Sequence, residues 1–252
     1  MAVEPVPGEA AALADLGNET ALVVADYHAG IEVGLRREGV ELASHAEERL
    51  TAISALIDRT VPDRLVILGD LGHAIGDPWY TERDEIEELL ASVLDRMPIT
   101  LVKGNHDGDV EALVDDLDLE VEITSTTGTR CGNVGLAHGH TWPGREVLGA
   151  DIVCVGHEHP EVRLEDEVGG RRLERVWLRG DLAPEPFQIH HGDSDLAIDG
   201  ELIVFPAFNE LSGGTWINVP DQEFLAPFLP DGLENGDAYL LDGTRLGPYE
   251  EL

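Results

Sequence analysis

Short apolar runs alternate with stretches of helical periodicity through the first half of the chain. The apolar runs have the length of β-strands and cover residues 20–25, 64–68 and 98–102. Residues 41–59 and 81–96 lie between them and carry apolar side chains three and four positions apart, which predicts two helices. Strands that alternate with helices are typical of a mostly parallel sheet covered by helices.

The second half of the chain has the pattern of a strand-rich region. After a short helix predicted over 109–116, a hairpin is predicted from residues 161–167 and 171–179, which flank Gly169-Gly170. Other apolar runs predict strands at 134–137, 151–155, 201–205, 215–218 and 238–241. We therefore expect an α/β fold with one domain over residues 1–252. Its architecture would be a two-sheet α/β/β/α sandwich of mixed sheets flanked by helices.

Acidic residues outnumber basic ones throughout the chain. The 51 Asp and Glu residues and the 16 Lys and Arg residues give a formal net charge of −35, and Lys103 is the single lysine. Repulsion among these charges would destabilise a compact fold in dilute buffer, whereas at about 1 M salt the screening length falls to about 3 Å. We therefore expect a halophilic protein adapted to a salt-loaded cytoplasm, with an ordinary acidic protein as the alternative.

The negative charge also argues against a broad nucleic-acid-binding surface, which needs clustered lysine and arginine. The local basic groups are Arg36-Arg37 and Arg171-Arg172. The first pair could reach a substrate phosphate, and a role on a helix surface is the alternative. No apolar run is long enough to span a membrane, and residues 1–16 lack the pattern of a signal peptide. A cytoplasmic location without membrane contact is therefore expected.

Polar segments follow five of the predicted strands, and they contain seven of the ten histidines. The segments are Asp26-Tyr27-His28, Gly69-Asp70-Leu71-Gly72-His73, Gly104-Asn105-His106-Asp107, His138-Gly139-His140 and Gly156-His157-Glu158-His159. Carboxylate, amide and imidazole groups bind hard or borderline divalent cations without thiolate. Two cations about 3.5–4 Å apart can share a carboxylate and hold a hydroxide between them for attack on phosphorus. These segments predict such a site at the carboxyl ends of the strands.

The order D-x-H, G-D, G-N-H-D, H-x-H and G-H-x-H resembles the calcineurin-like metallophosphoesterases, and this likeness covers about half of the chain. The resemblance implies that one metal ion is held by Asp26, His28, Asp70 and His159. It implies that a second is held by Asp70, Asn105, His138 and His157, with Asp70 bridging the two. In the fourth motif either His138 or His140 could be the ligand. His138 is favoured because it lies directly at the strand end, and His140 would then face the substrate.

The resemblance also implies roles beyond metal binding. His106 would contact the phosphate and protonate the leaving oxygen, with Asp107 orienting it. His73 follows Asp70 by three residues, as in the SbcD-like nucleases of the same superfamily, and would contact the substrate. The chain is also similar to small archaeal SbcD-related phosphoesterases. For His73 and His140 the alternative is an ordinary polar neighbour of the site, and for the other motif residues it is turn chemistry.

The expected function is therefore that of a metal-dependent phosphoesterase, a hydrolase with phosphodiesters as its expected substrates. Its cofactors would be two divalent cations. Mn²⁺ is the first choice, and Fe, Co or Zn ions suit the same nitrogen and oxygen ligands. One alternative is a DNA nuclease or end-processing factor of the SbcD type, which His73 favours and the negative charge opposes. A catalytically silent scaffold is the other alternative, and the complete set of motif residues argues against it.

Overall fold

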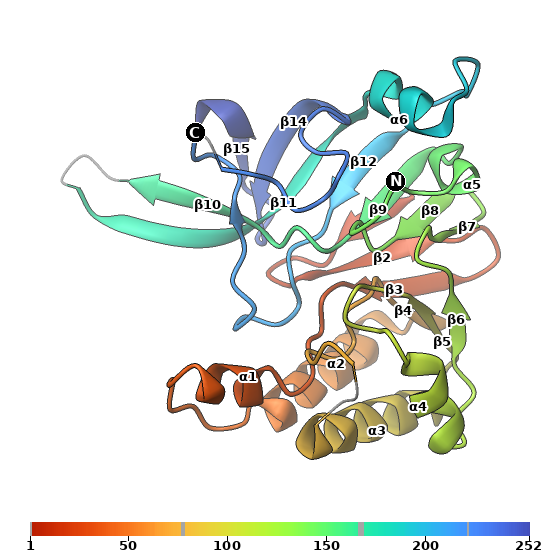
Figure 1. Cartoon of the computed structure of the whole chain (residues 1–252), viewed down its shortest axis with the longest axis vertical. Helices are drawn as coiled ribbons and strands as arrows, with labels where there is room; N and C mark the ends of the chain where they lie inside the picture. Colours follow the sequence, from red (N-terminus) through yellow and green to blue (C-terminus); the bar gives the residue numbers. More distant parts are fainter. Residues whose placement is uncertain (1, 77–78, 166–168, 221) are drawn as a thin grey trace.

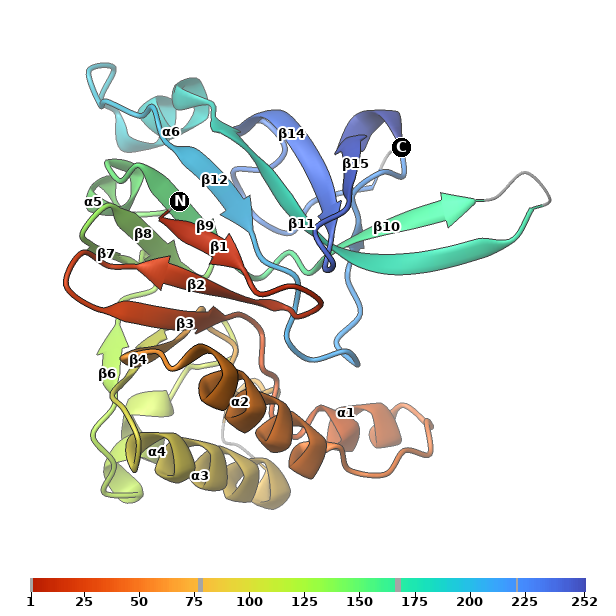
Figure 2. The ribbon, with the colours of Figure 1, turned by 180° about the vertical axis from the view of Figure 1, so that it is seen from behind.

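Two mixed β-sheets stack face to face, and helices cover their outer sides (Figure 1). The computed structural model describes residues 2–76, 79–165, 169–220 and 222–252. The expected α/β/β/α sandwich of mixed sheets is confirmed. Figure 2, the view from behind, shows the same layers and a long hairpin of two strands that projects from the body of the protein.

The first sheet has six strands in the order in which they occur in the chain. They are β1 (Val3–Pro5), β2 (Ala11–Asp15), β3 (Thr20–Val24), β4 (Arg64–Ile67), β5 (Ile99–Val102) and β6 (Glu122–Thr124). Strands β1 to β3 are antiparallel, whereas β3 to β6 run parallel. The parallel strands therefore bring the carboxyl ends of β3, β4 and β5 to the same edge of the sheet.

The second sheet combines β8, β9 and β12, which run parallel, with antiparallel neighbours. Its main path follows the order β13-β10-β11-β12-β9-β8-β7, and β14 pairs with β11 and β15. The strands are β7 (Thr129–Cys131), β8 (Val134–Ala137), β9 (Ile152–Val155), β10 (Pro160–Glu165), β11 (Arg171–Leu182), β12 (Glu201–Val204), β13 (Thr215–Trp216), β14 (Leu233–Leu240) and β15 (Arg245–Pro248). Strands β10 and β11 form the projecting hairpin.

Helices α1 to α4 lie on the outer side of the first sheet, and α5 and α6 lie beside the second (Figure 1). The helices are α1 (Ile31–Arg37), α2 (Ala46–Thr60), α3 (Tyr80–Leu94), α4 (Val110–Asp116), α5 (Arg145–Leu148) and α6 (Pro184–His191), and a short 3-10 helix, η1 (Tyr249–Glu251), follows β15.

Side-chain alternation along the strands divides the apolar residues among three cores. Leu22 of β3 packs with Ile53 of α2 in the core beneath the helices, whereas the next residue, Val23, packs with Trp177 between the sheets. A third core lies on the outer face of the second sheet, where Phe187 of α6 is fully buried. Strands buried on both faces are apolar throughout, which is why they appear as unbroken apolar runs in the sequence.

The structure contains elements that the apolar pattern did not predict. Strands β1 and β2 extend the first sheet at the N-terminal edge, and helix α1 follows the first polar segment almost directly. Helix α2 begins at Ala46 rather than at residue 41. The end of the predicted hairpin strand 161–167 lies outside the described residues, which omit 166–168. In the described part of the chain, no helix is long and apolar enough to cross a membrane.

Candidate metal centre

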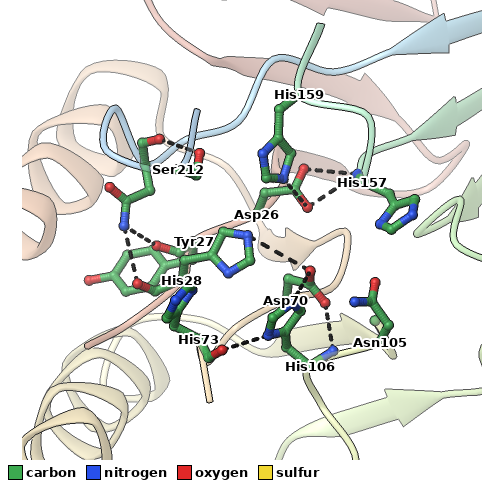
Figure 3. Close-up of polar contacts among 12 residues, drawn as sticks. Asp26, Tyr27, His28, Asp70, His73, Asn105, His106, His157, His159 and Ser212 are labelled. Carbon is green, nitrogen blue, oxygen red and sulfur yellow. Dashed lines mark hydrogen bonds and ion pairs between the residues drawn. The ribbon is translucent and has the colours of Figure 1, made fainter. Parts of the chain in front are cut away.

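The five polar segments meet where the carboxyl ends of the two sheets lie together. Asp26 and His28 follow β3, Asp70 follows β4, and Asn105 follows β5, whereas His138 follows β8 and the pair His157 and His159 follows β9. Figure 3 shows carboxylates and imidazoles from both sheets pointing toward one another. Residues 131 positions apart are thereby in contact, since the backbone N–H of His157 donates to Asp26.

Five of the expected metal ligands adopt a left-handed backbone conformation, which residues with side chains rarely do. The angle φ is 56° at Asp26, 48° at His28, 51° at Asp70, 68° at His157 and 46° at His159. Each such residue costs on the order of 1–3 kcal/mol and persists only where its surroundings impose it, which is typical of ligand-binding sites. The turn at both ends of the D-x-H segment lets Asp26 and His28 reach the same cluster of ligand atoms.

The first cluster consists of Asp26, His28 and His159, whose ligand atoms lie within 4.8 Å of one another. Nε2 of His159 is 3.2 Å from Oδ1 of Asp26, and Nδ1 of the same ring is 2.9 Å from the carbonyl oxygen of Gly213. Because a carbonyl only accepts, Nδ1 carries the proton and Nε2 faces the cluster. Nε2 of His28 is 3.8 Å from Oδ2 of Asp70, which brings Asp70 next to this group.

The second cluster consists of Asp70, His138 and His157, again within 4.8 Å. Nδ1 of His138 donates to the carbonyl oxygen of Leu68 at 2.7 Å, so its Nε2 is directed into the cluster. That Nε2 is 3.4 Å from Oδ1 of Asp70 and 3.1 Å from Oδ1 of Asn105. Asp70 thus lies between the two clusters, with one oxygen near each.

His138 and His140 differ in their relation to these clusters. His138 is fully buried and belongs to the second cluster, whereas among the described residues His140 belongs to neither. The ring of His140 lies 5.2 Å from that of His138 and 6.0 Å from that of His157. This geometry favours His138 as the ligand and leaves His140 beside the cluster.

Two of the histidine rings are in the neutral state that a divalent cation requires. Burial lowers the pKa of His28 and of His157 to about 4, so both rings are neutral and offer a lone pair. Burial alone would lower the pKa of His138, but the Asp70 carboxylate raises it to about 9. A site that attracts a proton so strongly also attracts a metal cation. Nδ1 of His28 is buried without a hydrogen-bond partner among the described residues. The two clusters of ligand atoms on either side of Asp70 are consistent with two cations.

His106 belongs to neither of these two clusters, but with His28 and His73 it forms a third group of ligand atoms within 4.8 Å of one another. Its Nδ1 is 2.6 Å from the carbonyl oxygen of His73, so Nδ1 donates and Nε2 faces Oδ2 of Asp70 at 3.8 Å. The rings of His106 and His73 are stacked with their centroids 5.6 Å apart. The side chain of His73 therefore lies at the site, as does that of His28, whose ring is 5.3 Å from it.

Asp107 makes a different contact from the one expected. Its Oδ2 accepts hydrogen bonds from the backbone N–H groups of Asp70 and Gly104, both at 2.8 Å, and its Oδ1 accepts one from Leu71 at 2.9 Å. Within the described ranges it forms no hydrogen bond with the His106 ring. Burial raises the pKa of Asp107 to about 6. The carboxyl group therefore positions the loop that carries Asp70, and the carbonyl of His73 orients His106.

Two supporting residues were missed in the sequence. Nδ2 of Asn209 donates to the carbonyl oxygens of Tyr27 and His28, at 2.9 and 3.1 Å, and so fixes the first ligand loop. Glu158, fully buried between His157 and His159 of the fifth motif, accepts hydrogen bonds from the N–H groups of Leu225 and Ala226. Asn209 follows a strand, as the motif residues do, and this position was the signal available in the sequence.

This fold and these clusters define a class of protein, the metal-dependent phosphoesterases. The model of the calcineurin-like phosphoesterase family matches residues 20–144, about half of the chain. This stretch holds four of the five motifs, and the fifth completes the same clusters. The chain belongs to the calcineurin-like phosphoesterase family and is a metallophosphoesterase, a hydrolase.

Of the two solved structures described next, the first shows the same fold. The crystal structure of the nuclease MPE from Pseudomonas putida is 22% identical, with a TM-score of 0.57, and the match covers 97% of this chain and 100% of that chain. Yfce, a phosphoesterase from E. coli, is 19% identical with a TM-score of 0.41, covering 82% of this chain and 96% of that one. No curated protein sequence matches the chain.

Proposed function

We propose that this metallophosphoesterase hydrolyses phosphodiesters with two divalent cations. Asp26, His28, Asp70 and His159 would hold one cation, and Asp70, Asn105, His138 and His157 would hold the other. The observation that supports this proposal most directly is the position of Asp70, with one carboxylate oxygen near each of two clusters of buried ligand atoms. When bound, such cations lower the pKa of water and neutralise the charge of a phosphate group.

The residues next to the clusters suit proton transfer. His106 would act as the general acid, because its Nδ1 proton is held by the His73 carbonyl and its Nε2 is directed toward Asp70. A proton on Nε2 would pass to the leaving oxygen of the ester. His73 and His140 would contact the substrate, since both side chains are partly exposed and their rings lie 5.6 Å from that of His106 and 5.2 Å from that of His138, respectively.

Mn²⁺ is the metal that we propose first. The ligands are carboxylate, amide and imidazole groups, and neither free cysteine, Cys131 or Cys154, belongs to a cluster in the described part of the chain. Fe²⁺, Co²⁺ and Zn²⁺ accept the same ligands. Reconstitution with each metal, followed by counting of bound ions by mass spectrometry, identifies the preferred one.

Hydrolysis of bis-p-nitrophenyl phosphate with Mn²⁺ tests the function. We expect metal-dependent turnover by the wild type and a loss of at least about a hundredfold in Asp70→Ala, together with loss of bound metal. Asp118→Ala is the matched control, because Asp118 is also left-handed, with a φ of 55°, and lies outside the clusters. Turnover that needs no metal, or an Asp70→Ala variant with normal activity, would contradict the proposal. Less than one bound metal ion per chain would instead favour the silent scaffold.

A DNA nuclease of the SbcD type is the second candidate. The stacking of His73 on His106 favours it, because a second imidazole beside the proposed acid can contact a diester. The relative from Pseudomonas putida is described as a nuclease. The net charge of −35 argues against a broad contact with a polyanion. Cleavage of single- and double-stranded oligonucleotides at molar KCl distinguishes a nuclease from an esterase of small diesters.

We also propose that the protein is adapted to high salt. Its support is the net charge of −35 with a single lysine. At about 1 M salt the Debye length is about 3 Å, which removes most repulsion among exposed carboxylates. We expect the melting temperature to rise from dilute buffer to molar KCl; equal melting temperatures in both would exclude this adaptation.

A further inference from the structure

Among the described residues of this acidic protein, Arg37 is one of the few cationic side chains without a carboxylate partner. Twelve of the 16 lysine and arginine residues form ion pairs with Asp or Glu. The other four form no ion pair with a described carboxylate; they are Arg36, Arg37, Arg130 and Arg163. Because carboxylates are abundant in this chain, an unpaired guanidinium near the metal centre indicates a different partner.

The guanidinium of Arg37 lies over the indole ring of Trp79. Its Cζ atom is 4.4 Å from the ring centroid. The aromatic face stabilises the cation, while the N–H groups at the edge of the guanidinium remain available as donors. Arg37 is exposed and Trp79 is partly exposed. Together they present a flat surface that is both aromatic and cationic.

This surface lies beside the metal centre. The ring of Trp79 is 6.3 Å from that of His73, which in turn lies 5.3 Å from His28 and 5.6 Å from His106. Gly34 of α1 permits this approach, since a Cβ atom there would be 2.9 Å from Nε2 of His73 and 3.6 Å from the Trp79 ring. The organic group of a phosphate ester at the metal centre would therefore be within reach of the surface.

The neighbouring segments expose apolar side chains beside acidic ones such as Glu38. Val40, Ile75 and Tyr80 are 47%, 83% and 80% exposed, and each lies within four residues of Arg37 or Trp79 in the sequence. The guanidinium would attract a second phosphate, but the indole ring and the apolar side chains would not. A nucleobase gains from all of these groups, because bases stack on aromatic rings and guanidinium planes and accept hydrogen bonds at their edges.

We propose that Arg37 and Trp79 form a nucleobase subsite, which holds the base of a nucleotide whose phosphate lies at the metal centre. The proposal rests on the phosphodiesterase function above and specifies its substrates as phosphodiesters of nucleosides. The stacked pair contacts the face of the base, and the free N–H groups of Arg37 donate to its ring nitrogen or carbonyl atoms.

Competitive inhibition separates recognition of the base from recognition of the phosphate. AMP and ribose 5-phosphate share a sugar phosphate, and only AMP carries a base. Each is measured as an inhibitor of Mn²⁺-dependent hydrolysis of bis-p-nitrophenyl phosphate at molar KCl. We expect the inhibition constant of AMP to be about tenfold lower than that of ribose 5-phosphate, as stacking of one base allows. Arg37→Gln and Trp79→Leu should each abolish most of this difference, and Trp79→Phe should retain it.

Arg36→Gln is the matched control, because it removes the same charge from the adjacent exposed position. It should leave the ratio of the two constants unchanged. A ratio near one in the wild type, or an equal loss in Arg36→Gln, overturns the proposal. So does equal weakening of both inhibitors in the Arg37 and Trp79 variants, which is the result of a purely structural role. If the wild type hydrolyses nothing, the proposed function fails separately, and equilibrium dialysis of labelled AMP and ribose 5-phosphate against the Mn²⁺-loaded protein still tests the subsite.

Discussion

The two halves of the metal centre are supported in different ways. The half from the first sheet, with Asp26, His28, Asp70 and Asn105, lies above a buried network of charged side chains. Arg49 of α2 contacts Glu32 of α1 at 2.7 Å and Glu85 of α3 at 2.8 Å. Glu85 also accepts a hydrogen bond from the N–H of Gly30, two residues after His28. Glu82, another buried residue of α3, accepts hydrogen bonds from the N–H groups of His73 and Ala74.

The half from the second sheet is held mainly by contacts with the backbone. Nδ1 of His138 donates to Leu68, and Nδ1 of His159 donates to Gly213. Glu158 accepts from the N–H groups of residues 225 and 226. The partners of the last two residues belong to the segment after β12, more than 50 positions further along the chain. Helices α1 to α3 therefore support the first half, whereas the segment after β12 supports the second half and, through Asn209, also contacts the first.

The charged network should have the largest effect on stability. Arg49, Glu32 and Glu85 have side chains no more than 7% exposed. Arg49→Met would leave two buried carboxylates without a cation, at a cost of about 3–5 kcal/mol in the free energy of unfolding. Urea unfolding at molar KCl measures this. Arg96→Met, which breaks an exposed pair with Asp58, is the control and should cost about 1 kcal/mol or less. Equal losses in the two variants would show that the network does not distinguish the first half.

The pH dependence of the same variant gives an independent check. Burial alone would raise the pKa of Glu32, but hydrogen bonds from Arg49 and from the N–H of His45 hold it below its usual value. In the wild type, the contribution of Glu32 to stability is therefore present at neutral pH and decreases as the pH falls through the pKa of the folded state. Without Arg49 the buried carboxyl group favours protonation. The loss of unfolding free energy in Arg49→Met, relative to the wild type, should therefore be smaller at about pH 5 than at pH 7.

The anchor of the second half should have the next largest effect. Glu158→Ala leaves the N–H groups of Leu225 and Ala226 without their acceptor, at a cost of about 1.5–3 kcal/mol. Relative to the wild type, hydrogen exchange in Glu158→Ala should accelerate more at these two amides than at other amides. Glu158→Gln keeps one acceptor oxygen and should lose less, and the exposed Glu223→Ala should change nothing. Unaltered exchange at residues 225 and 226 in Glu158→Ala would show that the C-terminal segment does not depend on this anchor.

Asn209 joins the two halves, and its loss should affect metal binding more than folding. Asn209→Ala removes the donor to the carbonyl oxygens of Tyr27 and His28, at a cost of about 1 kcal/mol. The left-handed turn at His28 would then be less well defined, so Mn²⁺ affinity should fall by about tenfold or more. Isothermal titration with Mn²⁺ measures this, with Asn235→Ala, a left-handed asparagine remote from the ligands, as control. Unchanged affinity would assign Asn209 to folding alone.

The sequence predicted one part of the molecule well and the other poorly, for a physical reason. Ligand residues follow apolar strands, and this local pattern located the five segments and the sandwich. The sequence did not predict the charged network, because its members lie on three helices and resemble ordinary surface charges in an acidic chain. They are Arg49, Glu32 and Glu85. The backbone contacts of Asp107 were not predicted either, since its three N–H donors become neighbours only after β4 and β5 pair. Contacts between distant segments carry no local signal.

Salt gives the smallest expected difference and sharpens the comparison between buried and exposed charges. Raising KCl from dilute to molar should stabilise wild type and Arg49→Met together, because it acts on carboxylates exposed to solvent. The network is buried, and buried pairs are screened much less than exposed ones. The difference in unfolding free energy between the two proteins should therefore stay constant to within about 0.5 kcal/mol across the salt series. A difference that disappears at high salt would mean that solvent and ions reach Arg49, and that the first half of the metal centre is no more protected from solvent than the protein surface.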